Sequence, residues 1–206
     1  MIDVQNDGVL CTLTINRPDK ANSLTHDMLE SLCVGVEEAR TARAVILTGV
    51  GKVFSAGADL QAAKAGLALS PLWERLSGAI ARHPGLTIAA LNGTVAGGAM
   101  GMVLSCDLRI AVPGTKVFYP VMKLGFLPQP SDPARLSALV GPSRAKMILM
   151  AGQKINTDEA KTWGLIDEVC EPEMLMDRAK GLTEDVCGAT AEHARAIKGL
   201  IAQRLP

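Results

Sequence analysis

The segment around which this chain is organised reads NGTVAGGAMGMVLSCD, residues 92–107. A short apolar run at residues 87–91 precedes it and is typical of a buried strand, and the apolar residues after its glycines predict a buried helix. Glycines at such a junction let the backbone approach a ligand, and the free N–H groups of the first helical turn face that ligand. The segment therefore predicts an anion hole.

A second glycine-rich segment, GVGKVFSAGADL, occupies residues 49–60 and follows a wholly apolar strand at residues 44–48. Open α/β sheets place ligands at loops of this kind, where a strand reaches its carboxyl end. Two strand, loop and helix units with small residues in their loops can bring two backbone N–H donors around one point. The alternative is a pair of tight turns with no ligand.

The flanking elements fit an α/β chain. Residues 9–16 alternate between apolar and polar and predict a half-buried strand, and Thr25 is placed to cap a helix that runs to about residue 40. Residues 61–70 look turn-like, residues 71–82 predict a helix directed at the second glycine loop, and residues 108–112 predict another strand.

Composition narrows the class of protein. A chain of 206 residues with 48% hydrophobic residues predicts a single domain, and equal numbers of basic and acidic residues (21 each) argue against nucleic acid or an anionic membrane as partner. No apolar run approaches the roughly 18 residues of a membrane span, and the first residues lack a leader pattern, so we expect a cytoplasmic protein. The five scattered cysteines are expected to be free thiols.

Three ordered motifs together resemble the enoyl-CoA hydratase/isomerase (crotonase) family: NRP and NSL within residues 16–24, FSAGADL at 54–60, and the glycine segment ending in CD at 92–107. Further matches at 123–128, 139–141, 151–155 and 159–169 extend the resemblance over about residues 4–175. The resemblance implies a crotonase-like α/β spiral of repeated ββα units. Residues 1–140 would form the acyl-CoA-binding core and residues 141–206 a helical oligomerisation region, shorter than usual for the family.

The resemblance also implies a chemistry. Family members bind an acyl-CoA thioester and hold its carbonyl oxygen, as it becomes an enolate, between two backbone N–H groups, which here are those of Ala58 and Gly98. The residues implied in CoA binding are Lys20, Asn22, Ser23, Ser55 and Ala56, with Arg17 near the phosphates or purely structural. No cofactor beyond the CoA moiety is expected, and no His, Cys or Asp cluster has metal-ligand spacing.

The usual acid/base residues are not where the family carries them. Relatives that hydrate a double bond have glutamates at positions that correspond to Gly101 and Val121 here, and neither residue can move a proton. We therefore expect a lyase or isomerase of fatty acid metabolism with non-standard catalytic residues. The alternatives are a CoA-thioester hydrolase or decarboxylase that uses other residues, and a catalytically silent acyl-CoA-binding or assembly subunit.

Asp132 and Tyr119 are the candidates to replace the glutamates, with Asp132 as a base and Ser131 or Tyr119 as a donor. For Asp132 the sequence favours helix capping, because Pro133 follows it, and for Tyr119 it favours plain packing. The three histidines, His26, His83 and His193, are expected to be surface or hydrogen-bonded residues.

The C-terminal segment also resembles part of the family. A helix predicted over residues 189–205 resembles the family segment that precedes two further helices closing the acyl pocket. A shorter end predicts a more open acyl site. We expect a homotrimer or a dimer of trimers.

Overall fold

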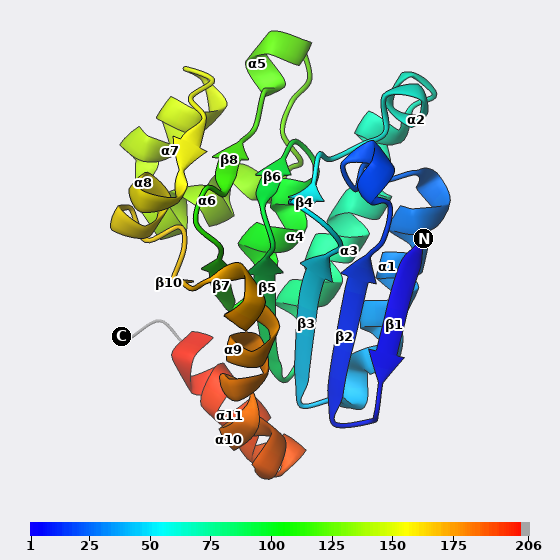
Figure 1. Cartoon of the computed structure of the whole chain (residues 1–206), viewed down its shortest axis with the longest axis vertical. Coiled ribbons are helices and arrows are strands. Elements are labelled where there is room, and N and C mark those ends of the chain that lie inside the picture. Colours follow the sequence, from blue (N-terminus) through cyan, green and yellow to red (C-terminus); the bar gives the residue numbers. More distant parts are fainter. Residues whose placement is uncertain (203–206) are drawn as a thin grey trace.

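The computed structural model describes residues 1–202, and a six-stranded sheet forms its centre in the order β1-β2-β3-β5-β7-β10 (Figure 1). Its strands are β1 (Ile2–Asn6), β2 (Leu10–Ile15), β3 (Ala44–Gly49), β5 (Leu86–Leu91), β7 (Leu108–Ala111) and β10 (Glu168–Val169). Only the β1–β2 pair within this sheet is antiparallel, so the carboxyl ends of β2, β3, β5 and β7 meet at one edge. The apolar run of β3 is explained by burial on both faces of the sheet.

A smaller sheet lies at that edge, in the order β4-β6-β8-β9. It consists of β4 (Val53–Ser55), β6 (Thr94–Ala96), β8 (Lys116–Phe118) and β9 (Ile155–Asn156). Each of β4, β6 and β8 follows a strand of the large sheet and precedes a helix. The chain is thus a series of ββα units, as predicted.

The helices cover the sheets unequally. They are α1 (His26–Glu38), α2 (Leu60–Lys64), α3 (Leu72–Ala81), α4 (Ala99–Ser105), α5 (Val121–Leu124), α6 (Asp132–Val140), α7 (Pro142–Leu149), α8 (Thr157–Thr162), α9 (Leu175–Gly181), α10 (Glu184–Gly188) and α11 (Ala191–Ala202), with 3-10 turns at Pro18–Lys20, Ala39–Thr41, Leu67–Leu69 and Pro172–Met174. In Figure 1, α1 and α3 lie behind the large sheet and α9 lies in front of it. No helix within residues 1–202 combines the length and the apolar character that crossing a membrane requires.

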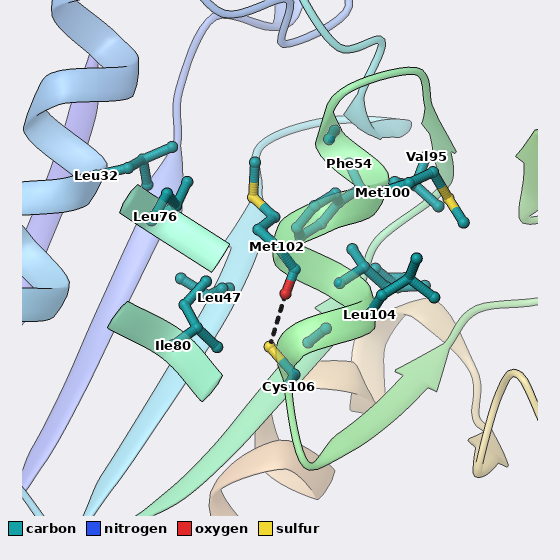
Figure 2. Packing of buried hydrophobic residues seen from close by; sticks show 14 of the residues in the cluster. Leu32, Leu47, Phe54, Leu76, Ile80, Val95, Met100, Met102, Leu104 and Cys106 are labelled. Carbon is teal, nitrogen blue, oxygen red and sulfur yellow. Dashed lines mark hydrogen bonds between the residues drawn. The ribbon is translucent and has the colours of Figure 1, made fainter. Parts of the chain in front are cut away.

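The main core lies between the large sheet and helices α1, α3 and α4 (Figure 2). Leu76 and Ile80 of α3 are four residues apart and present one apolar face, against which Leu32 of α1 and Met102 of α4 lie. All four side chains are buried. Burying a side chain of this size contributes about 1.5–3 kcal/mol, so this core holds α4 against α3.

Several sequence predictions are confirmed. Thr25 caps α1, because its side-chain oxygen accepts a hydrogen bond from the Met28 N–H at 3.3 Å. The predicted strands at 44–48, 87–91 and 108–112 correspond to β3, β5 and β7, and the helix predicted at 71–82 corresponds to α3.

Other predictions need correction. Strand β1 was not expected, since its sequence IDVQN has only two apolar residues and it gains its order by pairing with β2. The loops predicted at 49–60 and 92–98 contain the three-residue strands β4 and β6, which are too short to show a period in sequence. The turn-like stretch at 61–70 contains most of α2 and a 3-10 turn.

The Lys198 side chain connects the C-terminal helix to the start of the central strands. The Lys198 ammonium donates to Asp107 Oδ2 at 2.6 Å and to the Gly85 carbonyl at 2.8 Å. Asp107 also accepts from the backbone and side chain of Thr87. The predicted helix at 189–205 is therefore α11 over Ala191–Ala202, and residues 203–205 of that prediction lie outside the described residues.

Candidate active site

The two glycine loops touch each other at Gly57. This residue has a φ of +87°, and a Cβ atom added to it would lie 2.8 Å from the Ala96 carbonyl oxygen and 3.2 Å from the Gly98 nitrogen. Both the backbone conformation and the contact require glycine. The loop after β4 thus lies against the loop after β6, and a glycine at position 57 makes this contact possible.

Two backbone N–H groups of these loops are without an acceptor. The Gly57 carbonyl and the Asp59 N–H both bond to Leu24, at 2.8 Å each, so the intervening Ala58 N–H points to the opposite side of the chain. Within residues 1–202, neither the Ala58 nor the Gly98 N–H donates a hydrogen bond, and both residues are partly exposed. Unpaired N–H groups are costly to bury, so this pair is suited to receive an oxygen from a ligand.

Trp73 packs beside the second of these donors. A Cβ atom on Gly98 would lie 3.1 Å from the indole ring of Trp73, which leaves little room for a side chain on that face. The indole N–H donates to the Leu67 carbonyl at 2.7 Å and fixes the ring. The predicted helix therefore lies next to the second glycine loop, and the contact is made by its first turn.

The side chain of Asp132, which belongs to α6, reaches Gly101. Gly101 lies one helical turn after Gly98, in α4. Asp132 is 1% exposed, and its Oδ2 accepts a hydrogen bond from the Tyr119 hydroxyl at 3.0 Å. Its Oδ1 would lie 2.9 Å from a Cβ atom on Gly101, and it has no hydrogen-bond partner among the described residues. The nearest cation is Arg135 Nη1 at 4.0 Å, too far for a hydrogen bond and also without a partner there. A carboxyl group of α6 thus stands where a side chain of α4 would begin.

The surroundings of Asp132 favour its protonated form. Burial raises the pKa of this carboxyl group to about 6, and the charge of Glu74 adds to the rise, whereas the Tyr119 hydroxyl and Arg135 oppose it. Burial, with the negative charge of Asp132 next in size, raises the pKa of the Tyr119 phenol. The carboxyl group therefore titrates near neutrality, in the range of acid/base catalysts.

The capping role predicted for Asp132 is wrong, and the packing role predicted for Tyr119 is confirmed but incomplete. Asp132 does not cap α6: the helix begins at Asp132, and the N-cap residue Ser131 has no side-chain capping bond. Ser131 is instead held by Glu74, whose carboxylate accepts from its backbone N–H at 3.0 Å and its hydroxyl at 2.7 Å. Tyr119 is buried, yet it does more than pack, since it donates to Asp132 and accepts from the Gln129 N–H at 3.3 Å.

The residues proposed for CoA binding lie together on two joined loops. The Asn22 side chain is buried: its Oδ1 accepts from the Arg17 N–H, and its Nδ2 donates to the Val53 carbonyl. Ser55 Oγ donates to the Asn22 carbonyl at 2.8 Å and accepts from the Gly57 N–H at 3.2 Å. These two side chains hold the loops together, so they leave backbone atoms to meet a ligand.

Lys20, Ser23 and Ala56 lie on the same two loops. The Ala56 N–H donates to the Ala21 carbonyl at 3.0 Å, which places residue 56 beside the turn that carries Lys20. Lys20 and Ala56 are exposed, whereas Ser23 is buried. The exposed ammonium of Lys20 is thus available to a ligand at this edge.

Arg17 has a structural role. Its Nη1 donates to the carbonyl and hydroxyl oxygens of Ser23 and, at 2.9 Å, to Asp59 Oδ2. The Arg17 hydrogen bond holds the pKa of the Asp59 carboxyl group below its usual range. The other oxygen of Asp59 caps α2 through the Gln61 and Ala62 N–H groups.

The histidines fit the prediction. His83 is buried and hydrogen-bonded to the Ala39 carbonyl and the Gly85 N–H, and burial lowers its pKa. His26 and His193 are exposed. Within the described part of the chain, no group of three His, Cys, Asp or Glu side chains could hold a metal ion.

Sequence reasoning missed the side chains that enclose the site. Trp73, Glu74 and Arg135 reach it from the middle or start of helices, and Gln129 ties its own loop to the Ala68 carbonyl at 3.1 Å. Nothing in a helical period distinguishes these residues from ordinary core or surface positions. Their role depends on tertiary packing alone.

Surface hollows occur away from this site. One of about 680 Å³ is bounded by residues such as Arg82, His83 and Lys198, and one of about 410 Å³ by Thr12, Thr48 and others. Neither is lined by the unpaired N–H donors or by Asp132. The site is therefore defined by its donor geometry, with the Trp73 ring against Gly98 and the loop of Gln129 bonded to Tyr119.

A comparison with protein families decides the assignment. The family model described as enoyl-CoA hydratase/isomerase matches residues 5–205. The chain belongs to this family. Among curated relatives, the short-chain-enoyl-CoA hydratase of Clostridium acetobutylicum is 35% identical over 89% of this chain and 74% of its own length. The 1,2-epoxyphenylacetyl-CoA isomerase of Escherichia coli is 33% identical over 85% of this chain and 71% of its own.

Solved structures agree with the family assignment. The putative enoyl-CoA hydratase/carnithine racemase of Magnetospirillum magneticum superposes with a TM-score of 0.92 at 28% identity, covering 100% of this chain and 83% of that one. An enoyl-CoA hydratase of Bacillus anthracis gives 0.89 at 30% identity, covering 98% and 82%. The α/β fold with its repeated ββα units is the crotonase fold.

Proposed function

We propose that this protein binds an acyl-CoA thioester and stabilises its enolate between the Ala58 and Gly98 N–H groups. The observation that carries the proposal is that both groups lack an acceptor within residues 1–202 while their loops are in contact at Gly57. Two donors on one oxygen lower the barrier to forming negative charge there, and the loss of one costs about 3–4 kcal/mol in comparable sites. The thioester carbonyl is the group that acquires such a charge.

The proposed substrate has a polar and an apolar part. Lys20, Asn22, Ser23, Ser55 and Ala56 would meet the CoA moiety, mostly through backbone atoms, with the Lys20 ammonium near a phosphate. Leu60, Leu69 and Leu127 are 81%, 73% and 85% exposed and offer apolar surface for the acyl chain. Helices α2 and α5 project at the same end of the molecule in Figure 1.

Standard hydration is not the proposed reaction. The glutamates that family hydratases use correspond to Gly101 and Val121 here, so we propose a lyase or isomerase of acyl-CoA metabolism with another acid/base group. The proposal calls for no cofactor besides the CoA moiety, because enolate stabilisation and proton transfer need only N–H donors and an acid/base side chain. A thioester hydrolase or decarboxylase would draw on the same two donors.

The test removes one donor and controls for crowding. Gly98→Pro deletes the N–H group, whereas Gly98→Ala keeps it and adds a carbon atom against the same Trp73 ring. Turnover of a panel of enoyl-, 3-hydroxyacyl- and malonyl-type CoA thioesters should fall about 10²- to 10³-fold further in the proline variant than in the alanine variant. Equal activity in the two variants would contradict the role of the Gly98 N–H.

The absence of glutamates at positions 101 and 121 also favours a second candidate, a silent acyl-CoA-binding or assembly subunit. Titration calorimetry separates the two. Binding of acyl-CoA thioesters without turnover of any panel member would support the silent subunit, and turnover of one member would exclude it.

We further propose that the protein assembles as a homotrimer or a dimer of trimers. Support comes from the exposed apolar side chains of the C-terminal half, where Met147 and Met150 are 43% and 62% exposed. Size-exclusion chromatography with light scattering measures the mass directly. A monomer at micromolar concentration would refute the assembly.

A further inference from the structure

The Asp132 carboxyl group and Gly101 meet at the first turn of α4. Gly101 lies in the first turn of α4, three residues after the Gly98 donor, and the carboxyl group of Asp132 reaches this turn from α6. In a helix, residues three apart lie on one face, and each Cα–Cβ bond tilts toward the N-terminus. An oxygen placed where the Gly101 Cβ would point is therefore within about one helical turn, roughly 5 Å, of the Gly98 N–H.

A side chain at 101 and a carboxyl group at 132 exclude each other. The Cβ atom of even an alanine at 101 would be 2.9 Å from Asp132 Oδ1 and 3.3 Å from Oδ2, closer than carbon and oxygen normally pack. Because Asp132 is held by Tyr119 and lies at the rigid start of α6, it cannot swing away freely. The glycine at 101 makes room for a carboxyl group delivered by another helix.

We infer that the Asp132 carboxyl group is the acid/base group of this site, that it enters from α6 the space left open by Gly101, and that it moves a proton between the α- and γ-carbons of a bound 3-enoyl thioester. This inference rests on the proposed function, because it needs the thioester oxygen at Ala58 and Gly98. It explains why Oδ1 has no partner among the described residues although it is buried. An unpaired acceptor aimed at the donor turn is the group that can take a proton from a substrate.

The chemistry balances with one carboxylate. Oδ1 of Asp132 takes the proton from the α-carbon, and the electron pair of that C–H bond moves into a dienolate whose oxygen lies between the two N–H donors. The same carboxyl group returns the proton to the γ-carbon, the double bond ends between the α- and β-carbons, and the thioester carbonyl is restored. No water or co-reactant is consumed, so a second carboxylate to orient a water is unnecessary.

The charged groups around Asp132 suit this cycle. Arg135 from the same helix and Glu74 from α3 face it with opposite charges, and the Tyr119 hydroxyl donates to Oδ2, which leaves Oδ1 free. Tyr119 is thus a positioning residue. The raised pKa of Asp132, about 6, lets one group both accept and return a proton near neutral pH.

The test compares Asp132→Asn with Asp158→Asn, a matched control that changes an exposed acid in the first turn of α8. Conversion of a 3-enoyl-CoA to the 2-enoyl-CoA should fall about 10²- to 10⁴-fold in the first variant and stay unchanged in the second. Acyl-CoA affinity by calorimetry should stay within about threefold in both. For the unaltered protein, kcat/KM should rise with pH through an apparent pKa near 6, and the residual activity of Asp132→Asn should lose that dependence.

The outcomes separate the inference from the proposed function. Full isomerase activity in Asp132→Asn, or binding of acyl-CoA by the unaltered protein without any isomerisation, would overturn the inference and leave the proposed thioester site standing. Failure of the unaltered protein to bind acyl-CoA would refute the proposed function itself. Tyr119→Phe adds a third measurement: with the hydrogen bond to Oδ2 removed, the apparent pKa in kcat/KM should rise while acyl-CoA affinity is kept.

Discussion

Replacing Asp132 with asparagine should remove activity and should also remove the decrease in stability that deprotonation of this buried carboxyl group causes between about pH 4 and pH 8. The carboxyl group is 1% exposed, and burial raises its pKa from 3.8 to about 6. The folded state therefore binds the proton more tightly than the unfolded state does. As pH rises from about 4 to about 6, the unfolded state loses this proton before the folded state does, so the free energy of unfolding decreases. Above about pH 6 the free energy of unfolding no longer changes through this group.

The magnitude follows from the shift. Each pKa unit corresponds to 1.36 kcal/mol, so a rise from 3.8 to about 6 corresponds to about 3 kcal/mol in full and about 2–3 kcal/mol between pH 4 and pH 8. Asparagine carries no such titration. Its static effects, such as an unpaired amide hydrogen beside Gly101, are the same at both pH values and cancel in the comparison.

The assay is urea unfolding of the unaltered protein and Asp132→Asn at about pH 4 and pH 8, with Asp158→Asn as control. The stability of Asp132→Asn relative to the unaltered protein should increase by about 2–3 kcal/mol from the lower to the higher pH. The control should show no such change. Parallel pH profiles for Asp132→Asn and the unaltered protein would refute a buried, destabilised carboxyl group at this position.

Three further substitutions test the frame around the site. Gly57→Ala should lower the free energy of unfolding, measured in urea, by about 2–3 kcal/mol, because φ is +87° and the new carbon would lie 2.8 Å from the Ala96 carbonyl oxygen. A neutral effect would contradict the close contact of the loops. Thr25→Ala should cost about 1 kcal/mol by the same assay through loss of the α1 cap, and Thr25→Ser should restore it. Lys198→Met should speed amide hydrogen exchange in α11 with little change elsewhere, and unchanged exchange would show that other contacts hold this helix.

The sequence predicted the features that backbone geometry imposes on residue type. Position 57 must be glycine because of its φ and its contact with the next loop, so the contact of the two loops is accompanied by a glycine that is visible in the sequence. The apolar run of β3 and the capping threonine of α1 are visible in the same way. They give the ββα frame and the two candidate donors.

No residue type or local pattern in the sequence indicates the contacts of Asp132. A serine or aspartate before a proline is a common helix start, and this local pattern points to capping. What decides otherwise is the distance between α4 and α6, which brings the carboxyl group to Gly101 and the Tyr119 hydroxyl. Contacts between helices distant in sequence depend on packing, which a single sequence does not encode locally. The short strands β4 and β6 were not predicted for a related reason, since a strand of three residues is stabilised by pairing with neighbouring strands.

The Trp73 ring has a consequence for how firmly the Gly98 donor is held. Glycines stand at 97 and 98, just before α4, and at 101 in its first turn, so this turn has few side chains of its own to stiffen it. Its walls are supplied by the indole from α3 and the carboxyl group from α6. The direction of the Gly98 N–H is therefore set by α3 and α6, which do not contain this residue. Tolerance to mutation in those two helices would be limited by catalytic precision as much as by folding.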